Sequence, residues 1–244
     1  MARLLTPQRV LGRVRRTAAR TAWSIKWRGR SYSEYQRQHM DTLAEMDPRE
    51  AVGGLWDEIG QLQLDVLKRQ GLNPQHRLLD IGCGSLRGGL HMIRYLESGH
   101  YWGTELSGKL LDAGREFLRE EGLQDKNPHL TVVDGFSFKE LHGQQFDFVQ
   151  AFGVFTDIPA ELVRECFANL SRVLAPGGAF YASFGPAKSY MPDHVRVQFR
   201  YPWSFFQELA AEHGYSIAPV PDVKHPKGHA MLALRREGAN APTT

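Results

Sequence analysis

Short apolar runs alternate with longer segments of helical periodicity over most of the chain, from residue 77 to residue 234. The apolar runs predict seven strands, at residues 77–81, 101–104, 130–133, 146–151, 179–184, 216–220 and 230–234. Helices are predicted between them, at residues 86–97, 107–121, 159–174 and 202–213. This alternation predicts an α/β fold, a doubly wound and mostly parallel sheet with helices on both faces. Ligands of such a sheet bind beyond the carboxyl ends of its strands.

The last predicted strand departs from this alternation. Only residues 221–229 separate it from the strand before, and this stretch is too short for a helical crossover. We therefore predict that the last strand is antiparallel and forms a hairpin with its predecessor. The hairpin loop, which contains His225, Lys227 and His229, is then expected at the same carboxyl edge as the ligand.

The chain before the first strand is predicted to be helical. Residues 31–48 are polar, the glycines at 53 and 54 interrupt the pattern, and residues 55–70 place apolar side chains on one helical face. We interpret residues 1–50 as a basic, helical N-terminal extension and residues 51–244 as the catalytic domain.

Charge is distributed unevenly along the chain. The chain has 30 basic and 27 acidic residues, and residues 1–30 contain nine of the basic residues and none of the acidic ones. The favoured interpretation of residues 1–30 is a solvated basic helix folded onto an acidic body. A second interpretation is an amphipathic helix in peripheral contact with an anionic membrane. A nucleic-acid arm or an organelle transit peptide comes third, and we expect no nucleic-acid partner.

The two cysteines, Cys83 and Cys166, lie far apart in the sequence. This separation excludes a disulfide scaffold and a cysteine-rich zinc module, so we expect no metal and a reducing compartment. No apolar run approaches the roughly 18 residues that a membrane span needs. The sequence therefore predicts a cytoplasmic protein, with membrane contact only through residues 1–30.

A glycine-rich turn follows the first predicted strand. Residues 78–89 read LLDIGCGSLRGG, and their G-x-G-x-x-x-G spacing differs from the G-x-G-x-x-G of dinucleotide-binding turns. Glycines allow the backbone to approach a ligand closely, and the following helix offers free N–H groups. Asp80 precedes the glycines, where a carboxylate repels pyrophosphate but attracts an ammonium group.

Two further acidic residues follow the next two strands. Glu105 ends the second strand, where a carboxylate can accept hydrogen bonds from both ribose hydroxyls. Asp134 follows the third strand and could accept a hydrogen bond from an adenine amino group, while Phe136 packs on the ring. Together with Asp80, they form a set of acids at three consecutive strand ends.

These residues resemble the class I S-adenosylmethionine-dependent methyltransferases, over about residues 78–234. The resemblance implies a Rossmann-like methyltransferase fold and S-adenosylmethionine as cofactor. Residues 80–84 look like the first family motif, residues 146–152 like the fourth-strand motif and residues 172–178 like the family's helix-to-strand turn. The cofactor-binding residues that it implies are Asp80, Gly82, Cys83, Gly84, Glu105, Leu106, Asp134, Gly135, Phe136 and Ala151.

Two positions of the glycine-rich turn depart from the family pattern. Leu86 stands where the family usually has a third glycine, and Arg87 is an unusual addition. Arg87 could bind the cofactor's carboxylate or lie on the helix surface, and the surface position is the preferred interpretation. Cys83 is interpreted as a small packing residue.

The resemblance implies displacement of the sulfonium methyl group by a substrate nucleophile, so a general base is useful for a hydroxyl acceptor. His225 is the preferred base. Asp157 is a second candidate at a position where many relatives have histidine, although an aspartate before a helix-starting proline also suits a cap. Other candidates are Tyr190, Asp193 and His194 in a lid loop over residues 185–201, His229 in the hairpin loop, and Trp56 and Glu58 on the helix at 55–70.

The leading functional hypothesis is therefore a methyltransferase that acts on an oxygen or nitrogen atom of a small molecule, a sugar or a lipid-linked metabolite. A nucleic-acid or protein methyltransferase is the alternative, which only the basic arm supports. A nicotinamide-dependent oxidoreductase would not need Asp80 or Asp134. A non-catalytic scaffold would not need the three acids.

Overall fold

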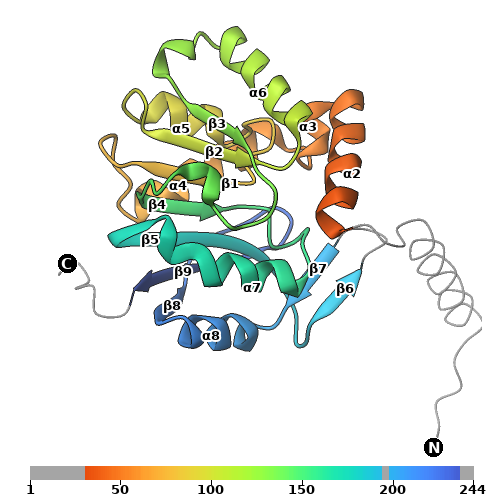
Figure 1. Cartoon of the computed structure of the whole chain (residues 1–244), viewed down its shortest axis with the longest axis vertical. Coiled ribbons are helices and arrows are strands. Elements are labelled where there is room, and N and C mark those ends of the chain that lie inside the picture. Colours follow the sequence, from red (N-terminus) through yellow and green to blue (C-terminus); the bar gives the residue numbers. More distant parts are fainter. Residues whose placement is uncertain (1–30, 194–197, 237–244) are drawn as a thin grey trace, which may run out of the picture.

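The structure is a computed structural model that describes residues 31–193 and 198–236. The interpretations of residues 1–30 and of His194 lie outside this part of the chain. A twisted sheet forms the centre of the molecule, and helices cover both of its faces (Figure 1). Within the described residues, every helix is too short or too polar to cross a bilayer.

Seven strands form the main sheet and confirm the predicted α/β class. Five of them are parallel, in the order β3 (His129–Val132), β2 (Tyr101–Glu105), β1 (Leu78–Ile81), β4 (Phe146–Ala151) and β5 (Leu174–Pro186). The other two are β9 (Ala230–Arg236) and β8 (Tyr215–Pro219). The last strand, β9, is antiparallel to both β5 and β8, as its short connection predicts.

Two short strands extend the sheet to nine and correct the prediction of a lid loop over residues 185–201. They are β6 (Met191–Asp193) and β7 (Gln198–Tyr201). The strand β7 pairs with the end of β5 at Gly185 and Pro186, and β6 pairs antiparallel with β7. Within β7, Phe199 and Tyr201 are buried while their neighbours are exposed. This alternation over four residues is the signal that the sequence analysis missed.

Seven α-helices connect or cover the strands. They are α2 (Tyr32–Met46), α3 (Pro48–Ala51), α4 (Trp56–Arg69), α5 (Gly89–Tyr95), α6 (Gly108–Glu120), α7 (Ala160–Asn169) and α8 (Trp203–Glu212) among the described residues. Short 3₁₀ turns lie at Gln124–Lys126, Lys139–Leu141 and Leu170–Arg172. The predicted cap of α6 is confirmed, because the Ser107 side chain accepts a hydrogen bond from the Leu110 N–H.

Two predicted helices are shorter in the structure than in the prediction. The helix expected from residue 86 begins at Gly89, because Leu86 has a left-handed backbone with φ of 70°. The helix expected to reach residue 174 ends at Asn169. Leu174 instead opens β5 and pairs with Phe146 of β4, so sheet pairing determines where the helix must stop.

Alternate residues of the central strands contribute to two apolar clusters on opposite faces of the sheet. On one face, Phe180 of β5 packs against Phe155 and against Phe167 of α7, and Phe167 in turn packs against Phe206 of α8. On the other face, side chains such as Tyr181 of β5 pack in a cluster with residues of α4, α5 and α6. The strands are thus held from both sides, and their carboxyl ends form a fixed edge.

Candidate active site

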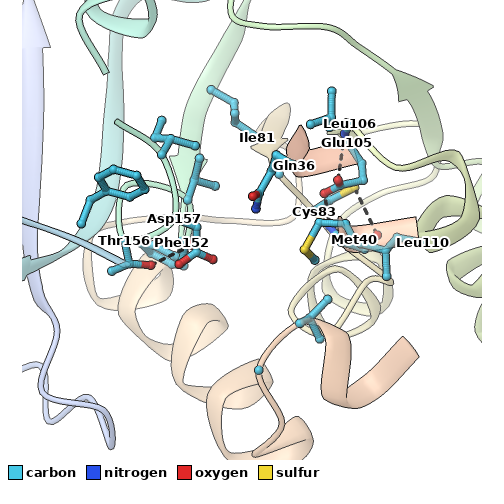
Figure 2. A pocket seen from close by; sticks show the side chains of 18 of the residues that line it. Gln36, Met40, Ile81, Cys83, Glu105, Leu106, Leu110, Phe152, Thr156 and Asp157 are labelled. Atoms are coloured by element: carbon cyan, nitrogen blue, oxygen red, sulfur yellow. Dashed lines mark hydrogen bonds between the residues drawn. The ribbon is translucent and has the colours of Figure 1, made fainter. Parts of the chain in front are cut away.

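A cavity of about 490 Å³ lies at the carboxyl edge of the sheet. Its lining comes from the ends of β1, β2, β4 and β5, from β7, from α2 and from the loop between β8 and β9. Figure 2 shows Glu105, Leu106 and Cys83 toward one side of the cavity, called the first side below. Thr156 and Asp157 lie toward the other, second side. Elements that are distant in the sequence therefore meet around one space.

The glycine-rich turn after β1 forms the floor of the first side. Gly82 and Gly84 have φ of 68° and 57°, which favour glycine. Space is limited as well, because a Cβ atom on Gly82 would lie 2.5 Å from Val154 Cγ2 and one on Gly84 would lie 2.5 Å from Val52 Cγ1. Cys83 between them is buried, and burial raises the pKa of its thiol well above the usual value. Its thiol is therefore protonated and packs as an apolar group.

Asp80 lies at the base of the cavity, at the end of β1. Its Oδ2 accepts a hydrogen bond of 2.7 Å from the Tyr101 hydroxyl. Burial raises the pKa of the Asp80 carboxyl to about 6, against the opposing effect of this hydrogen bond and of Arg87. A cationic ligand group beside Asp80 would stabilise its charged form.

Glu105 connects the ends of two strands. Its Oε2 accepts a hydrogen bond from the Gly84 N–H at 3.0 Å, and its Oε1 accepts from the N–H groups of Leu106 and Ser107 at 2.8 and 3.0 Å. Burial raises the pKa of this carboxyl, whereas the three backbone donors lower it. The carboxylate is thus held in one orientation at the cavity wall, where its remaining lone pairs can accept ligand hydroxyls.

Eight of the ten predicted cofactor residues line the cavity, including Gly135 and Phe136 after β3. The two others do not line it. Asp134 points to Arg37 of α2, with 3.4 Å between its Oδ2 and the guanidinium Nη2, and its side chain is 62% exposed. Ala151 is fully buried at the end of β4.

The helix α2 covers the cavity, although the sequence analysis placed it in the extension. Tyr32, Gln36, Met40 and Leu43 line the cavity from one side of this helix, and their spacing of three to four residues is a signal of a shared face. Gln36 is buried, and its Oε1 has no hydrogen-bond partner among the described residues. Figure 2 shows Gln36 and Met40 beside the cavity.

A second face of α2 is polar and attaches the helix to the body. Besides Arg37, Asp41 accepts a hydrogen bond from the Ser107 hydroxyl, and Glu45 pairs with Lys109. These three side chains of α2 are four residues apart and therefore point in the same direction. They hold α2 against the start of α6, which lies beside it in Figure 1.

Asp157 lies on the second side of the cavity. Removal from bulk water raises the pKa of its carboxyl to about 7, although a hydrogen bond from Thr156 and the charges of Lys227 and Arg87 lower it. The Tyr32 hydroxyl donates to the Asp157 carbonyl oxygen at 2.6 Å. Asp157 is not the cap of the next helix, because α7 begins at Ala160 and Pro159 holds the cap position.

His225 and His229 lie next to each other in the β8–β9 loop and line the same cavity. Their rings are stacked with 4.2 Å between centroids. Burial and neighbouring cations lower the pKa of both imidazoles to about 4, so both are neutral near neutral pH. The Lys227 N–H donates to His225 Nδ1 at 3.2 Å, which leaves the ring proton of a neutral His225 on Nε2.

Arg87 also lines the cavity, so the preferred interpretation of a surface side chain is wrong. Its Nη1 donates to the carbonyl oxygens of Val52 and Gly54 at 2.7 and 3.0 Å. Lys227 donates to the carbonyl oxygen of Gly53, between them. Two cations, one from the glycine-rich turn and one from the hairpin loop, thus hold the segment between α3 and α4 in place.

The remaining candidates lie outside the cavity lining. Trp56 packs against Phe117, with ring centroids 5.2 Å apart, and Glu58 is exposed. Tyr190 accepts a hydrogen bond from the Ala160 N–H at 3.3 Å, and Asp193 lies in β6. Their positions on α4, in β6 and directly before β6 argue against a direct role in ligand contact.

Known proteins share this arrangement. Residues 79–180 match the family described as methyltransferase domain. A ubiquinone biosynthesis O-methyltransferase of Aromatoleum aromaticum is 30% identical over 155 residues, which are 62% of this chain and 59% of that protein. An uncharacterised protein of Rickettsia prowazekii is 26% identical over 121 residues, 47% of this chain and 46% of that protein. The chain therefore spans about half the length of these curated relatives.

Solved structures are similar in fold. The magnesium protoporphyrin IX methyltransferase of Synechocystis PCC 6803 with bound S-adenosylmethionine has a TM-score of 0.65 at 16% identity, over 86% of this chain and 99% of that one. An S-adenosylmethionine-dependent methyltransferase of Leishmania major has a TM-score of 0.66 at 13% identity, over 88% of this chain and 89% of that one.

The sheet order and the similar solved structures show a Rossmann-like methyltransferase fold, and residues 79–180 match the methyltransferase domain family. The chain is therefore similar to methyltransferase domains, and S-adenosylmethionine, which is bound in one of the similar structures, is the cofactor to compare with its cavity. The residues present suit this cofactor. The turn with Gly82 and Gly84, called the glycine cradle below, lets a ligand approach the backbone closely. The buried Gln36 Oε1 and Thr104 Oγ1 at the cavity lack hydrogen-bond partners among the described residues.

Proposed function

We propose that the protein transfers the methyl group of S-adenosylmethionine to an oxygen or nitrogen atom of a small molecule, a sugar or a lipid-linked metabolite. The observation that carries this proposal is a single cavity that joins the glycine cradle to Asp157 and the paired histidines. A donor in the cradle and an acceptor beside Asp157 would thus share one space. The curated relative, a ubiquinone biosynthesis O-methyltransferase, supports a small-molecule acceptor.

In this proposal the first side of the cavity holds the cofactor. Asp80 and the backbone around Gly82 and Gly84 bind its methionine portion, and Glu105 accepts hydrogen bonds from the ribose hydroxyls. Gly135 and Phe136 flank the adenine. Asp134 can contact the adenine only if its ion pair with Arg37 breaks. Ala151 is fully buried, so it would act only by supporting the wall of the cavity. The cofactor supplies an activated methyl group on its sulfonium sulfur.

The chain's own contribution is to position the acceptor, exclude water and receive a proton. Asp157 suits the role of general base, because a carboxyl with a pKa of about 7 is available to take up a proton at neutral pH. His225 suits it less, because its pKa is about 4 and its Nδ1 already accepts a hydrogen bond. We therefore assign His225 the role of a hydrogen-bond donor to the acceptor, through Nε2.

Calorimetric titration of the purified chain with S-adenosylmethionine, S-adenosylhomocysteine and NADH tests the proposal. We expect saturable binding of the two adenosyl ligands and none of NADH. Binding of NADH alone would favour an oxidoreductase, and silence from both adenosyl ligands would favour a scaffold.

A nucleic-acid or protein acceptor remains the alternative substrate class, and it depends on residues 1–30, which lie outside the described residues. The same holds for membrane contact through that segment, and a cytoplasmic location is likewise a prediction from sequence.

A further inference from the structure

Three cationic side chains surround the second side of the cavity. Arg87 comes from the glycine-rich turn, Lys227 from the β8–β9 loop and Arg200 from β7. None of the three takes part in the ion pairs that the described residues form. Other described arginines at the surface do form such pairs, among them Arg94 with Glu121. The cavity therefore contains positive charge without a bonded counter-ion.

The Arg87 side chain is largely buried, so leaving its charge without a bonded counter-ion costs free energy. Its Nε is buried and has no hydrogen-bond partner among the described residues. Burial lowers the pKa of its guanidinium to about 10, which still leaves the group charged at neutral pH. A buried charge is stable only when it is paired or hydrogen-bonded, so an anionic group in the cavity would complete the environment of Arg87.

The acidic groups of the chain balance these cations only in part. The acidic group that acts most strongly on Arg87 is Asp80, at the end of β1 on the cofactor side, whose pKa is about 6. Asp157 is the carboxyl whose charge acts on both Arg87 and Lys227, and its pKa of about 7 leaves it partly neutral. Glu50 also acts on Lys227, but its side chain lies beside Gly54. The two histidines are neutral. The second side of the cavity thus keeps a net positive charge near neutral pH.

The contacts of these cations within the chain do not require charge. Among the described residues, the side chains of Arg87 and Lys227 donate only to backbone carbonyl oxygens of the segment between α3 and α4, which a neutral amide could also satisfy. Arg200 is exposed at β7 and makes no hydrogen bond with its side chain among the described residues. Its charge, like theirs, remains available to a ligand.

We propose that the methyl acceptor is an anion, and that Lys227 and Arg200 bind its carboxylate or phosphate group. This inference rests on the proposed function, because it names the class of acceptor for the same cavity. Arg87 lies next to the glycine cradle, where it can also meet the cofactor's own carboxylate. Lys227 and Arg200 belong to the hairpin loop and β7, on the side of Asp157, and they carry the assignment.

The anchored group is then not the nucleophile, because the cations draw charge away from it. Another oxygen or nitrogen of the acceptor forms the new bond to the methyl carbon. The bond between that carbon and the sulfonium sulfur breaks, its electron pair stays on sulfur, and the acceptor's proton passes to Asp157. The methylated product keeps its carboxylate or phosphate and leaves as an anion.

The experiment measures anion binding to the full chain saturated with S-adenosylhomocysteine, so that the cofactor's own carboxylate site is filled. Inorganic phosphate and benzoate are titrated separately by calorimetry, at an ionic strength held constant with chloride. We expect saturable binding of at least one of them, and the two arms distinguish a phosphate acceptor from a carboxylate acceptor. Absence of binding for both anions overturns the inference.

Substitutions test whether Lys227 and Arg200 bind the anion. Lys227→Gln keeps a donor for the Gly53 carbonyl but removes the charge, and together with Arg200→Gln it should weaken anion binding at least about tenfold. Lys227→Arg, with Arg200 unchanged, keeps the charge and should bind the anions like the parent. Lys224→Met removes a charge from the same loop outside the cavity and is expected to bind like the parent. Equal binding by all variants shows a nonspecific effect and overturns the inference.

The two proposals fail separately in this experiment. If S-adenosylhomocysteine does not bind, the proposed function fails at the cofactor. If S-adenosylhomocysteine binds in the parent and in every variant while the anions do not, only the anionic acceptor is wrong. Circular dichroism of each variant verifies that the fold is intact.

Discussion

At the scale of single residues, the surroundings of a group decide its chemistry more than its type does. Asp157 and Asp112 are both aspartates, yet removal from water raises the pKa of Asp157 to about 7, while Asp112 forms an exposed ion pair with Arg115. His225 is the residue type that most often acts as a base near neutral pH. Burial beside cations lowers its pKa to about 4 and removes that property.

Asp157→Asn should lower the rate of methyl transfer by about 10²- to 10⁴-fold, the usual contribution of a general base. A base must be deprotonated, so the parent's rate should rise with pH through the Asp157 pKa of about 7, and this rise should disappear in the variant. Turnover against pH, with S-adenosylhomocysteine affinity as the control for the fold, makes the measurement. A variant that keeps the rise would assign the base to another group.

Glu105→Ala should weaken S-adenosylmethionine binding by about 1–3 kcal/mol, because it removes a carboxylate that is prepared to accept ligand hydroxyls. The substitution also frees the N–H groups of Gly84 and Leu106, so thermal stability is measured in parallel. Asp112→Asn on the surface of α6 is the matched control. Equal affinities of the two variants in calorimetry would remove Glu105 from the cofactor site.

At the scale of elements, α2 shows which properties a local sequence pattern predicts and which it does not. Its capping box of Ser31 and Glu34 and its polar composition predict a helix. Nothing local indicates that one face would cover a cavity and another would bind α6, because both faces are defined by residues far along the chain. The site therefore includes an element that the sequence analysis assigned to the extension.

Met40→Asp tests the role of α2 in ligand binding. Met40 lines the cavity, so a buried carboxylate there should weaken S-adenosylhomocysteine binding by about tenfold or more. Met46 is 79% exposed at the end of the same helix, and Met46→Asp should leave binding unchanged. Calorimetry on both variants makes the comparison. Unchanged affinity for Met40→Asp would show that α2 does not close over the cofactor.

At the scale of the whole molecule, the uneven charge along the chain is the feature with the clearest consequence. Residues 1–30 are basic and contain no acid, whereas the rest of the chain is mildly acidic. A chain of this kind can hold the arm by intramolecular attraction or present it to an anionic surface.

Co-sedimentation with anionic liposomes distinguishes these interpretations. The favoured one, a helix folded onto the acidic body, predicts equal and weak binding by the full chain and by a chain that lacks residues 1–30. Stronger binding by the full chain, lost at high salt, would instead support membrane contact. Neutral liposomes serve as the control for nonspecific sedimentation.

Much of the fold and part of the site followed from the sequence, for an identifiable reason. The seven main strands and the antiparallel last strand follow from local periodicity and from the length of one connection. Eight of the ten predicted cofactor residues line the cavity because they stand at strand ends, and the ends of parallel strands meet at one edge.

Other features depended on contacts between distant segments. The pairing of β7 with the end of β5, the ion pair of Asp134 with Arg37, and the turn of Arg87 toward the carbonyl oxygens of Val52 and Gly54 each join residues far apart in the chain. The shifted pKa values of Asp157 and His225 likewise come from burial that no local pattern records. The sequence by itself determined the order of the main elements, because that order depends on local spacing. Only the tertiary structure decided which charges face the cavity, because that depends on what surrounds each side chain.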